Sequence, residues 1–338
     1  MGYTVSILDD VRAAIAASDT VLTEARERLR LVRDIASTFP GALRTYASGS
    51  IPQFTVNHPV SDGDGGLVLD RRCYPKLGPE GGGEAPEDVT AELCKLLGPR
   101  IRETYEKGSC GRSKRGPKVR FGAPLEDQDP TVDLVVALTR RDGDGLWIPN
   151  LEKNTWEPSD PEAHVQLLNT GSTALLRMRR RVVRLAKAWN KQYSTPGFSS
   201  FNLSMLALEA ITGGQNLANA LATFFSHAVD AVAAGDTEDP AHVSSSIKLL
   251  IPREDAVRRL RRAAASLDEA LAHDDDEDAV RAALAKVFWD YVDDPASEPF
   301  TAAVAALRSR RPVTTGTLGL VGPAVAVPPT RAYGGGHS

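Results

Sequence analysis

Tyr46-Ala47-Ser48-Gly49-Ser50 leads into Ser61-Asp62-Gly63-Asp64, and these two stretches indicate the fold of the chain. A turn of small residues is followed there by two aspartates one residue apart. Side chains alternate between the two faces of a β-strand, so Asp62 and Asp64 would point into one cleft. A third aspartate, Asp133, lies in an apolar run at 131–138. If that run is a neighbouring strand, the three carboxylates meet.

Three neighbouring carboxylates have a specific chemical use. They raise one another's pKa unless cations neutralise them. Mg²⁺ takes oxygen ligands and keeps open positions for phosphates and water. Two such ions about 3.5–4 Å apart can hold both the attacking and the leaving oxygen of an in-line displacement. A turn of small residues lets backbone amides approach a triphosphate. Together, the three carboxylates and this turn fit metal-dependent nucleotidyl transfer.

Other interpretations of the aspartates remain open on the residues alone. Asp-Gly-Asp-Gly-Gly at 62–66 is also typical of a solvated turn. It is a poor calcium loop, because the twelfth position, where such a loop needs Glu, is Cys73. Asp133 stands between Val132 and Leu134, where a buried charge is costly unless it is paired or bound to metal. Its alternative is an edge strand with the carboxylate in solvent.

Gly49-Ser50, Thr55, Asp62-x-Asp64 and Asp133 together resemble the polymerase-β-like nucleotidyltransferase superfamily. A second block resembles the helical half shared by the cGAS/DncV-like nucleotidyltransferases (CD-NTases) and the oligoadenylate synthases; it comprises Arg184–Lys191, Phe198-Ser199-Ser200-Phe201-Asn202-Leu203 and Leu206-Ala207-Leu208-Glu209. A third block is similar to the same family and comprises Trp147–Asn150, Trp156 and Asp160-Pro161-Glu162-Ala163-His164. The resemblance covers residues 40–255, and bacterial members of that family belong to CBASS anti-phage signalling systems.

The resemblance implies an α+β fold with a polymerase-β-like nucleotidyltransferase core, a mixed sheet with flanking helices, and a helical C-terminal lobe of the oligoadenylate-synthase type. The expected division is a catalytic core with its N-terminal helix at 1–158, a helical lobe that completes the nucleotide cleft at 159–310, and a flexible tail at 311–338. The implied activity joins nucleoside triphosphates into a cyclic di- or trinucleotide second messenger and releases pyrophosphate.

Site residues carry over from the family by position. Asp62, Asp64 and Asp133 match the catalytic, metal-binding triad for two Mg²⁺ ions, with Mn²⁺ as a substitute, and Asp133 would also help to activate the attacking ribose hydroxyl. The nucleotide-binding positions are Gly49 and Ser50 for the donor phosphates, Lys187 and Ser200 for the triphosphate, and Phe201 for stacking on a base.

The implied partners are ATP or other nucleoside triphosphates, a separate effector protein that binds the product, and regulatory or conjugating proteins. No membrane partner is expected. The sequence departs from the family at Pro52, Gln53 and Gly65-Gly66, and in a long insert at 78–87 rich in Gly and Pro. These departures leave the strand geometry open but not the presence of the carboxylates.

Composition sets broad limits. The chain has 338 residues, 42% of them hydrophobic, which is enough for a substantial core or two lobes. A net charge of −4 gives no global basis for nucleic-acid binding. Cys73, Cys94 and Cys110 lack metal-ligand spacing and indicate reduced thiols. No signal peptide is apparent and no apolar run approaches membrane-spanning length, so we expect a cytoplasmic protein.

Periodicity predicts the elements around these motifs. Residues 6–38 are predicted to be helical, with Ser18 or Asp19 as a cap and 24 and 26–28 among the outward positions. Strands are expected at 66–70, 118–121 and 131–139, with a hairpin near 142–145 and a helix at 88–107. Residues 160–310 are predicted to be mostly helical, above all 170–193, where Trp189 is assigned to the core and Ser199-Ser200 resembles a helix cap.

Three charged or flexible segments allow more than one interpretation. The basic stretch 108–118 is either a solvated loop or a phosphate or polynucleotide contact. The acidic run 274–278 is predicted to be a solvated loop that favours the following helix dipole. The Gly- and Pro-rich end after residue 311 is predicted to be a flexible tail. The resemblance adds an alternative, because some members of the family have their C-terminal tail conjugated to a target.

Two other functions remain as alternatives. A nucleotidyltransferase that modifies an RNA end or a protein would use the same three aspartates, and the basic stretch 108–118 would serve it. A binding or scaffold protein with a degenerate site is a different class, and the intact Gly-Ser turn and aspartates argue against it.

Overall fold

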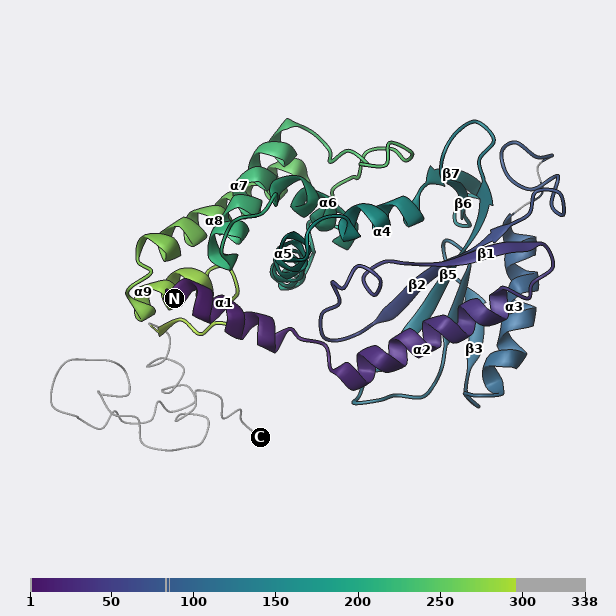
Figure 1. Cartoon of the computed structure of the whole chain (residues 1–338), viewed down its shortest axis with the longest axis horizontal. Coiled ribbons are helices and arrows are strands. Elements are labelled where there is room, and N and C mark those ends of the chain that lie inside the picture. The colour runs from purple at the N-terminus through teal and green to yellow at the C-terminus, as the bar shows by residue number, and fades with distance from the viewer. Residues whose placement is uncertain (1, 83, 85, 296–338) are drawn as a thin grey trace, which may run out of the picture.

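The structure is a computed structural model that describes residues 2–82, 84 and 86–295. It has two lobes, a sheet flanked by helices and a bundle of helices, with α4 between them (Figure 1). The helices are α1 (Tyr3–Ala14), α2 (Asp19–Ala36), α3 (Pro86–Arg102), α4 (Pro161–Asn169), α5 (Thr173–Lys191), α6 (Ser200–Ala210), α7 (Leu217–Ala234), α8 (Arg253–Ala272) and α9 (Glu277–Ala285). The strands are β1 (Ala42–Ser48), β2 (Asp62–Leu69), β3 (Ser109–Arg112), β4 (Pro117–Arg120), β5 (Thr131–Thr139), β6 (Leu146–Asn150) and β7 (Thr155–Ser159).

The sheet is mixed, as the expected α+β fold requires. Its strand order is β1-β2-β5-β4-β3, with β6 paired to β5 and β7 paired to β6. β2 and β5 run parallel, and the remaining neighbours are antiparallel. Helices α2 and α3 cover the sheet and share one apolar core with it, to which Leu29, Leu93 and Val132 contribute. β2 and β5 are therefore the central strands, and their apolar residues anchor the site.

The N-terminal helical region is interrupted, and its two halves belong to different lobes. α1 ends at Ala14, and α2 begins after Ser18, whose side chain accepts a hydrogen bond from the backbone N–H of Val21. Ser18 is therefore the cap, one of the two predicted candidates. Ile7 and Leu8 of α1 lie in the core of the helical lobe, whereas α2 packs on the sheet.

Arg28 departs from its predicted outward position, because its side chain is 1% exposed. The guanidinium donates to Asp129 at 2.6 Å, to Glu24 at 2.8 Å and to the Pro130 carbonyl at 2.9 Å, and lies over the ring of Phe121. A buried guanidinium is tolerated when its donors are satisfied in this way. Its long-range partners are on the segment that leads into β5, which local periodicity does not reveal.

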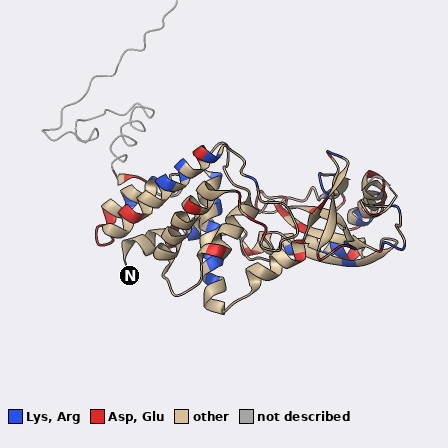
Figure 2. Ribbon diagram, turned by 90° about the horizontal axis from the view of Figure 1, so that it is seen from above, with Lys and Arg blue, Asp and Glu red and all other residues tan. Residues whose placement is uncertain are grey.

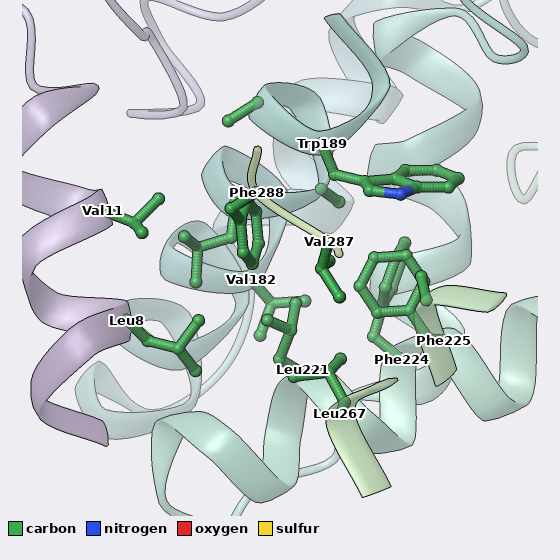
Figure 3. Close-up of a cluster of buried hydrophobic side chains, with 14 of the residues drawn as sticks. Leu8, Val11, Val182, Trp189, Leu221, Phe224, Phe225, Leu267, Val287 and Phe288 are labelled. Atoms are coloured by element: carbon green, nitrogen blue, oxygen red, sulfur yellow. The ribbon is translucent and has the colours of Figure 1, made fainter. Parts of the chain in front are cut away.

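The core of the helical lobe is large and aromatic (Figure 3). Trp189 of α5 packs edge-on against Phe225 of α7, as the predicted core position requires. Leu8 and Val11 project from α1 toward Val182 of α5 (Figure 3). The lobe therefore closes only when the first helix of the chain joins the later ones.

α7 changes one expectation, because by length and composition this helix is apolar enough to cross a membrane. In the fold it packs against α5, α6 and α8. Phe224, Phe225 and Ala228 on α7 are fully buried. These contacts account for its apolar character as that of a core helix.

Most other predicted elements are present with shifted ends. The hairpin near 142–145 joins β5 to β6, and the helix predicted at 88–107 is α3. β1 was not among the predicted strands. The acidic run precedes α9, as expected of a helix-dipole partner, and Asp276 is in addition its N-cap. Asp274 accepts a hydrogen bond from the backbone N–H of Thr4, so it ties this loop to α1. The predicted tail at 311–338 lies outside the described residues.

Candidate active site

The parallel pairing of β2 and β5 brings the three aspartates together. Asp64 pairs in register with Asp133, and Asp62 pairs with Thr131. Asp62 and Asp64 lie two residues apart on one strand, so both carboxylates are on the same face. The run 131–138 is thus a central strand beside them, and an edge-strand position for Asp133 is wrong.

The Gly-Ser turn lies against Asp64. Ser48, the last residue of β1, pairs with Asp64, and the chain turns at Gly49, whose φ is +70°. A Cβ at this position would stand 2.0 Å from Oδ2 of Asp64. Position 49 therefore requires glycine for two reasons: its backbone conformation and the close approach of the Asp64 carboxylate.

A cavity of about 530 Å³ lies between the sheet and the helical lobe. Seven of the eight sequence-predicted site residues line it: Gly49, Ser50, Asp62, Asp64, Lys187, Ser200 and Phe201. They come from the turn after β1, from β2, and from α5 and α6, which follow β2 by more than a hundred residues of chain. A volume of this size is typical of a small-molecule site.

Asp133, the eighth residue, lies next to this group, but its carboxylate is paired with a lysine. Its Oδ2 accepts a hydrogen bond of 2.6 Å from Nζ of Lys118, its register partner on β4. Among the described residues, no three His, Cys, Asp or Glu side chains are grouped closely enough to hold one metal ion. The observed position of Asp133 is therefore that of an ion pair.

The charge of the site is unbalanced around Asp64. Burial, together with the neighbouring Asp62 and Asp133, raises the pKa of Asp64 to about 7. A divalent cation would relieve this repulsion, and carboxylate oxygens are the donors that Mg²⁺ prefers. The donor set therefore fits such an ion by its chemistry, provided that Asp133 exchanges Lys118 for it.

Lys187 supplies a cation on the opposite wall. Burial and the neighbouring Lys191 lower its pKa to about 8. Its Nζ donates to Oγ1 of Thr55 at 3.0 Å and to the Thr55 carbonyl at 3.2 Å. This contact joins α5 to the segment that follows the Gly-Ser turn, so it couples the two lobes across the cavity.

The start of α6 is held rigidly at the cavity. Ser199 caps the helix by accepting from the N–H of Asn202 at 3.1 Å, as predicted. Asn190 of α5 accepts from the N–H groups of Gly197 and Phe198 and donates to the Phe198 carbonyl. These bonds fix the segment between α5 and α6, so Ser200 is presented at a helix N-terminus, where anions are stabilised.

Sequence reasoning gave no role to a buried pair on the same cavity wall. Nε2 of His164 lies 2.7 Å from Oδ1 of Asp239, and the His164 ring packs on that of Phe201 with centroids 4.6 Å apart. His164 belongs to one of the family blocks, which is the available signal. Asp239 is 75 residues away, and nothing local marks it.

The basic stretch 108–118 is a β-hairpin rather than a loop, formed by β3 and β4. Each of its four cations is paired with a carboxylate, and Figure 2 shows acidic and basic residues interspersed in the helical lobe as well. The pairs are Arg112 with Glu87, Lys114 with Glu152, Arg115 with Glu157, and Lys118 with Asp133. The hairpin therefore offers few free charges to a polynucleotide.

No family model and no curated protein matches this sequence. Solved structures do match the fold. The CD-NTase CdnG of Bradyrhizobium diazoefficiens, in complex with GTP, is 15% identical with a TM-score of 0.65, over 85% of this chain and 96% of that one. E. coli CdnC with ATP is 20% identical with a TM-score of 0.63, over 87% and 99%.

Vibrio cholerae DncV, a cyclic AMP-GMP synthase described as a prokaryotic cGAS homologue, is 18% identical with a TM-score of 0.52, over 72% of this chain and 68% of that one. These likenesses include both lobes of the chain, and the expectation of an α+β nucleotidyltransferase fold is confirmed. The chain has the fold of the CD-NTases.

Proposed function

We propose that this protein is a metal-dependent nucleotidyltransferase that joins nucleoside triphosphates into a cyclic di- or trinucleotide and releases pyrophosphate. The observation that carries the proposal is the register of Asp64 with Asp133 on parallel β2 and β5, beside a cavity bordered by the Gly49-Ser50 turn and Lys187. Carboxylates, a turn of small residues and a buried cation are the parts that phosphoryl-type transfer requires.

Asp62, Asp64 and Asp133 would hold two Mg²⁺ ions or Mn²⁺. Bound there, divalent cations lower the pKa of a ribose hydroxyl and neutralise the charge that develops on the triphosphate. The chain itself supplies the position of these ligands. β2 and β5 are central strands with buried apolar residues, so the carboxylates cannot separate when charge accumulates.

The triphosphate would lie between the turn and the two helices. Gly49 admits the close approach of backbone to phosphate, and Ser50 adds a hydroxyl. Lys187 and Ser200 face the same space from α5 and α6. A phosphate oxygen would replace Thr55 as the acceptor of the Lys187 ammonium, which a negatively charged partner keeps protonated at neutral pH.

The similar structures support a nucleotide substrate. CdnG is in complex with GTP and CdnC with ATP, while DncV appears with the linear intermediate 5′-pppA(3′,5′)pG. By analogy, we propose stepwise synthesis through a linear intermediate in this chain. The RNA-modifying alternative has weaker support, because the four cations of the stretch 108–118 that would serve it are each paired with a carboxylate.

The wider role follows from the same analogy. We propose a part in anti-phage signalling from the cytoplasm, in which a separate effector protein binds the product. One similar structure holds CdnC together with a HORMA protein. A regulatory protein of this kind is therefore part of the proposal, as is a conjugating protein.

The test is incubation of the purified protein with four α-labelled nucleoside triphosphates and Mg²⁺ or Mn²⁺. Products are treated with phosphatase and separated. We expect small phosphatase-resistant products, and omission of single nucleotides then identifies the bases. The double variant Asp62→Ala/Asp64→Ala is the control and should form none. Products that appear only after RNA is added, with label in the RNA, would contradict the proposal and favour the RNA-modifying enzyme.

A further inference from the structure

The wall of the cavity around His164 combines an aromatic surface with a fixed hydrogen-bonding group. His164 is 7% exposed, and its ring meets the Phe201 ring at 50°. Both residues line the cavity together with Ser244. They come from α4, α6 and the segment after α7. Three separate parts of the helical half therefore converge on one small surface, which the proposed catalytic chemistry does not use.

Asp239 holds the imidazole in one orientation. Its Oδ2 accepts from the N–H and the hydroxyl of Ser244, both at 2.8 Å, and its Oδ1 accepts from the N–H of Ala241 at 3.1 Å. Burial opposes ionisation of Asp239, but these hydrogen bonds outweigh it and lower its pKa to about 2. The Asp239 carboxylate is therefore an acceptor, and Nε2 of His164 must carry the proton that it receives.

In the neutral imidazole that carries this proton on Nε2, Nδ1 is the remaining ring nitrogen and is an acceptor. Nδ1 has no hydrogen-bond partner among the described residues. The ring that carries it is held on both sides, by Asp239 and by Phe201. A fixed acceptor beside an aromatic face is a suitable arrangement for a planar heterocycle that has N–H donors.

We propose that His164 is a specificity-determining residue that, with Phe201, binds the nucleobase of a substrate by stacking and by an Nδ1 hydrogen bond. The inference rests on the proposed function. It favours bases with an exocyclic amino group or ring N–H at the matching edge, and it makes Asp239 a positioning residue. A purely structural role for the pair is the competing explanation, since a buried His–Asp bond also joins α4 to the 236–251 segment.

Binding measurements with and without a base separate the two explanations. Titration calorimetry in Mg²⁺ compares ATP, GTP, CTP and UTP with inorganic tripolyphosphate, which has the phosphates but no base. His164→Gln keeps an N–H donor for Asp239 but removes the ring. We expect it to weaken nucleotide binding about five- to fiftyfold, from the usual worth of a base stack and a hydrogen bond, and to leave tripolyphosphate binding unchanged.

Two further variants complete the design. His164→Phe keeps the ring, so it should recover part of the affinity and lose discrimination among the four nucleotides. Lys187→Met should weaken the binding of nucleotides and of tripolyphosphate to the same extent. The inference is overturned if the His164 variants bind all ligands like the wild type, or lose tripolyphosphate equally. A wild-type protein that binds none of the five ligands would instead contradict the proposed function, and melting curves identify any unfolded variant.

A second inference is independent of nucleotides and concerns two cysteines. Cys94 on α3 and Cys110 on β3 have their sulfurs 3.0 Å apart, with the Cys110 thiol donating to Cys94. This hydrogen bond lowers the pKa of Cys94. Neither cysteine is fully buried. The sequence indicated reduced thiols but not that Cys94 and Cys110 are in contact, because the two residues lie on different elements.

We infer that Cys94 and Cys110 form a reversible disulfide when a peroxide is the oxidant. The Cys94 thiolate attacks one oxygen of the O–O bond, the other oxygen leaves as hydroxide and is protonated, and Cys94 becomes a sulfenic acid. The Cys110 sulfur then displaces the sulfenic hydroxyl and gives up its thiol proton, so the hydroxyl leaves as water. Two thiols are oxidised and one hydrogen peroxide is reduced to two waters. The new bond would join α3 to the sheet edge at β3.

The test is peptide mapping of the native protein after hydrogen peroxide, with free thiols blocked by a maleimide. We expect one linked peptide pair containing Cys94 and Cys110, reversed by dithiothreitol, while Cys73 remains alkylated. In Cys110→Ser the reaction should stop at a sulfenic acid on Cys94, which dimedone traps. Absence of the linked pair in monomeric protein, or faster oxidation of Cys73, would overturn the inference.

Discussion

Asp64 carries a carboxylate in a buried position between two other aspartates, which raises its pKa to about 7. In the unfolded chain an aspartate titrates near pH 4. Between these values the folded state binds a proton that the unfolded state does not. The metal-free protein should therefore lose stability as pH rises from about 4 to 7. Asp64 thus imposes a stability cost at neutral pH in exchange for a strong cation ligand.

We expect Asp64→Asn to stabilise the metal-free protein at pH 8 by on the order of 1–3 kcal/mol and to abolish nucleotidyl transfer. The gain should vanish at pH 4, where the wild-type carboxyl is already neutral. Urea denaturation in EDTA at the two pH values measures it. Asp34→Asn is the control, since the Asp34 side chain is 65% exposed on α2. An equal gain at pH 4 would contradict the electrostatic explanation.

Arg28 is also a buried charged residue of the sheet lobe. Unlike Asp64, it has oppositely charged partners and carbonyls that accept its hydrogen bonds. Arg28→Lys keeps the charge but cannot reach Glu24, Asp129 and the two backbone carbonyls together. We expect it to lower the free energy of unfolding by about 2–4 kcal/mol, measured by urea denaturation. Arg30→Lys, on the exposed side of the same helix, should leave the midpoint unchanged. A similar small effect at both positions would refute the role of Arg28.

At the scale of elements, the turn between β1 and the following segment is the most constrained. In Gly49→Ala, the new methyl group would meet Asp64 Oδ2 and the residue would keep a φ of +70°. We expect nucleotide binding to weaken about 10- to 100-fold, because the turn must move away from the carboxylate. Calorimetric titration with ATP measures this.

The control for this turn is Gly111→Ala on β3, where a Cβ meets only the end of the Arg120 side chain at 3.7 Å. It should bind ATP like the wild type. If Gly49→Ala also bound ATP normally, the close approach of Asp64 to the turn would have no functional importance.

Two adjacent serines at the start of α6 have different roles, one in capping the helix and the other in lining the cavity. Ser199 caps the helix, whereas Ser200 lines the cavity. We expect Ser199→Ala to lower stability by about 1 kcal/mol. Ser200→Ala should leave stability unchanged and weaken tripolyphosphate binding about three- to tenfold. Thermal unfolding and calorimetry distinguish them, and an exchange of the two results would mean that the assignment of roles is wrong.

The elements also show how far sequence reasoning reaches. Asp62 and Asp64 were predictable because strand periodicity places alternate residues on one face. Asp133 was predictable because a charge in an apolar run needs a partner. Its partner Lys118 was not, since that contact depends on how β4 pairs with β5, and the His164–Asp239 bond joins elements 75 residues apart. Long-range pairing determines these contacts, and local patterns do not encode it.

At the scale of the whole molecule, the described chain crosses between lobes twice, between α1 and α2 and again after β7. Periodicity predicted the helices on both sides of the first crossing but not that they separate. Their apolar faces look alike in sequence, and only the available partners decide where each packs. The predicted division into a catalytic core and a helical lobe at residue 158 stays a prediction. α1 lies in the first part of that division by sequence, but it packs in the core of the helical lobe.

This arrangement makes α1 a test of how the lobe is held. Leu8 is fully buried against the helical core (Figure 3). We expect Leu8→Ala to lower stability by about 2–5 kcal/mol. Hydrogen exchange should accelerate in α7 and α9 more than in β2 and β5. Asp10→Ala, on the exposed side of α1, is the control, and uniform acceleration in both lobes would show that they unfold as one unit.

The same packing has a consequence during synthesis. The ribosome makes α1 before the helices that bury it, and its contacts in α5, α7 and α9 are completed only near Phe288. At about 5–20 residues per second, α1 waits roughly 15 to 60 s with its apolar face uncovered, while the sheet lobe can already fold around α2. α1 therefore leaves the ribosome before α5, α7 and α9 but is buried only together with them, and in that interval its apolar face is accessible to chaperones and proteases.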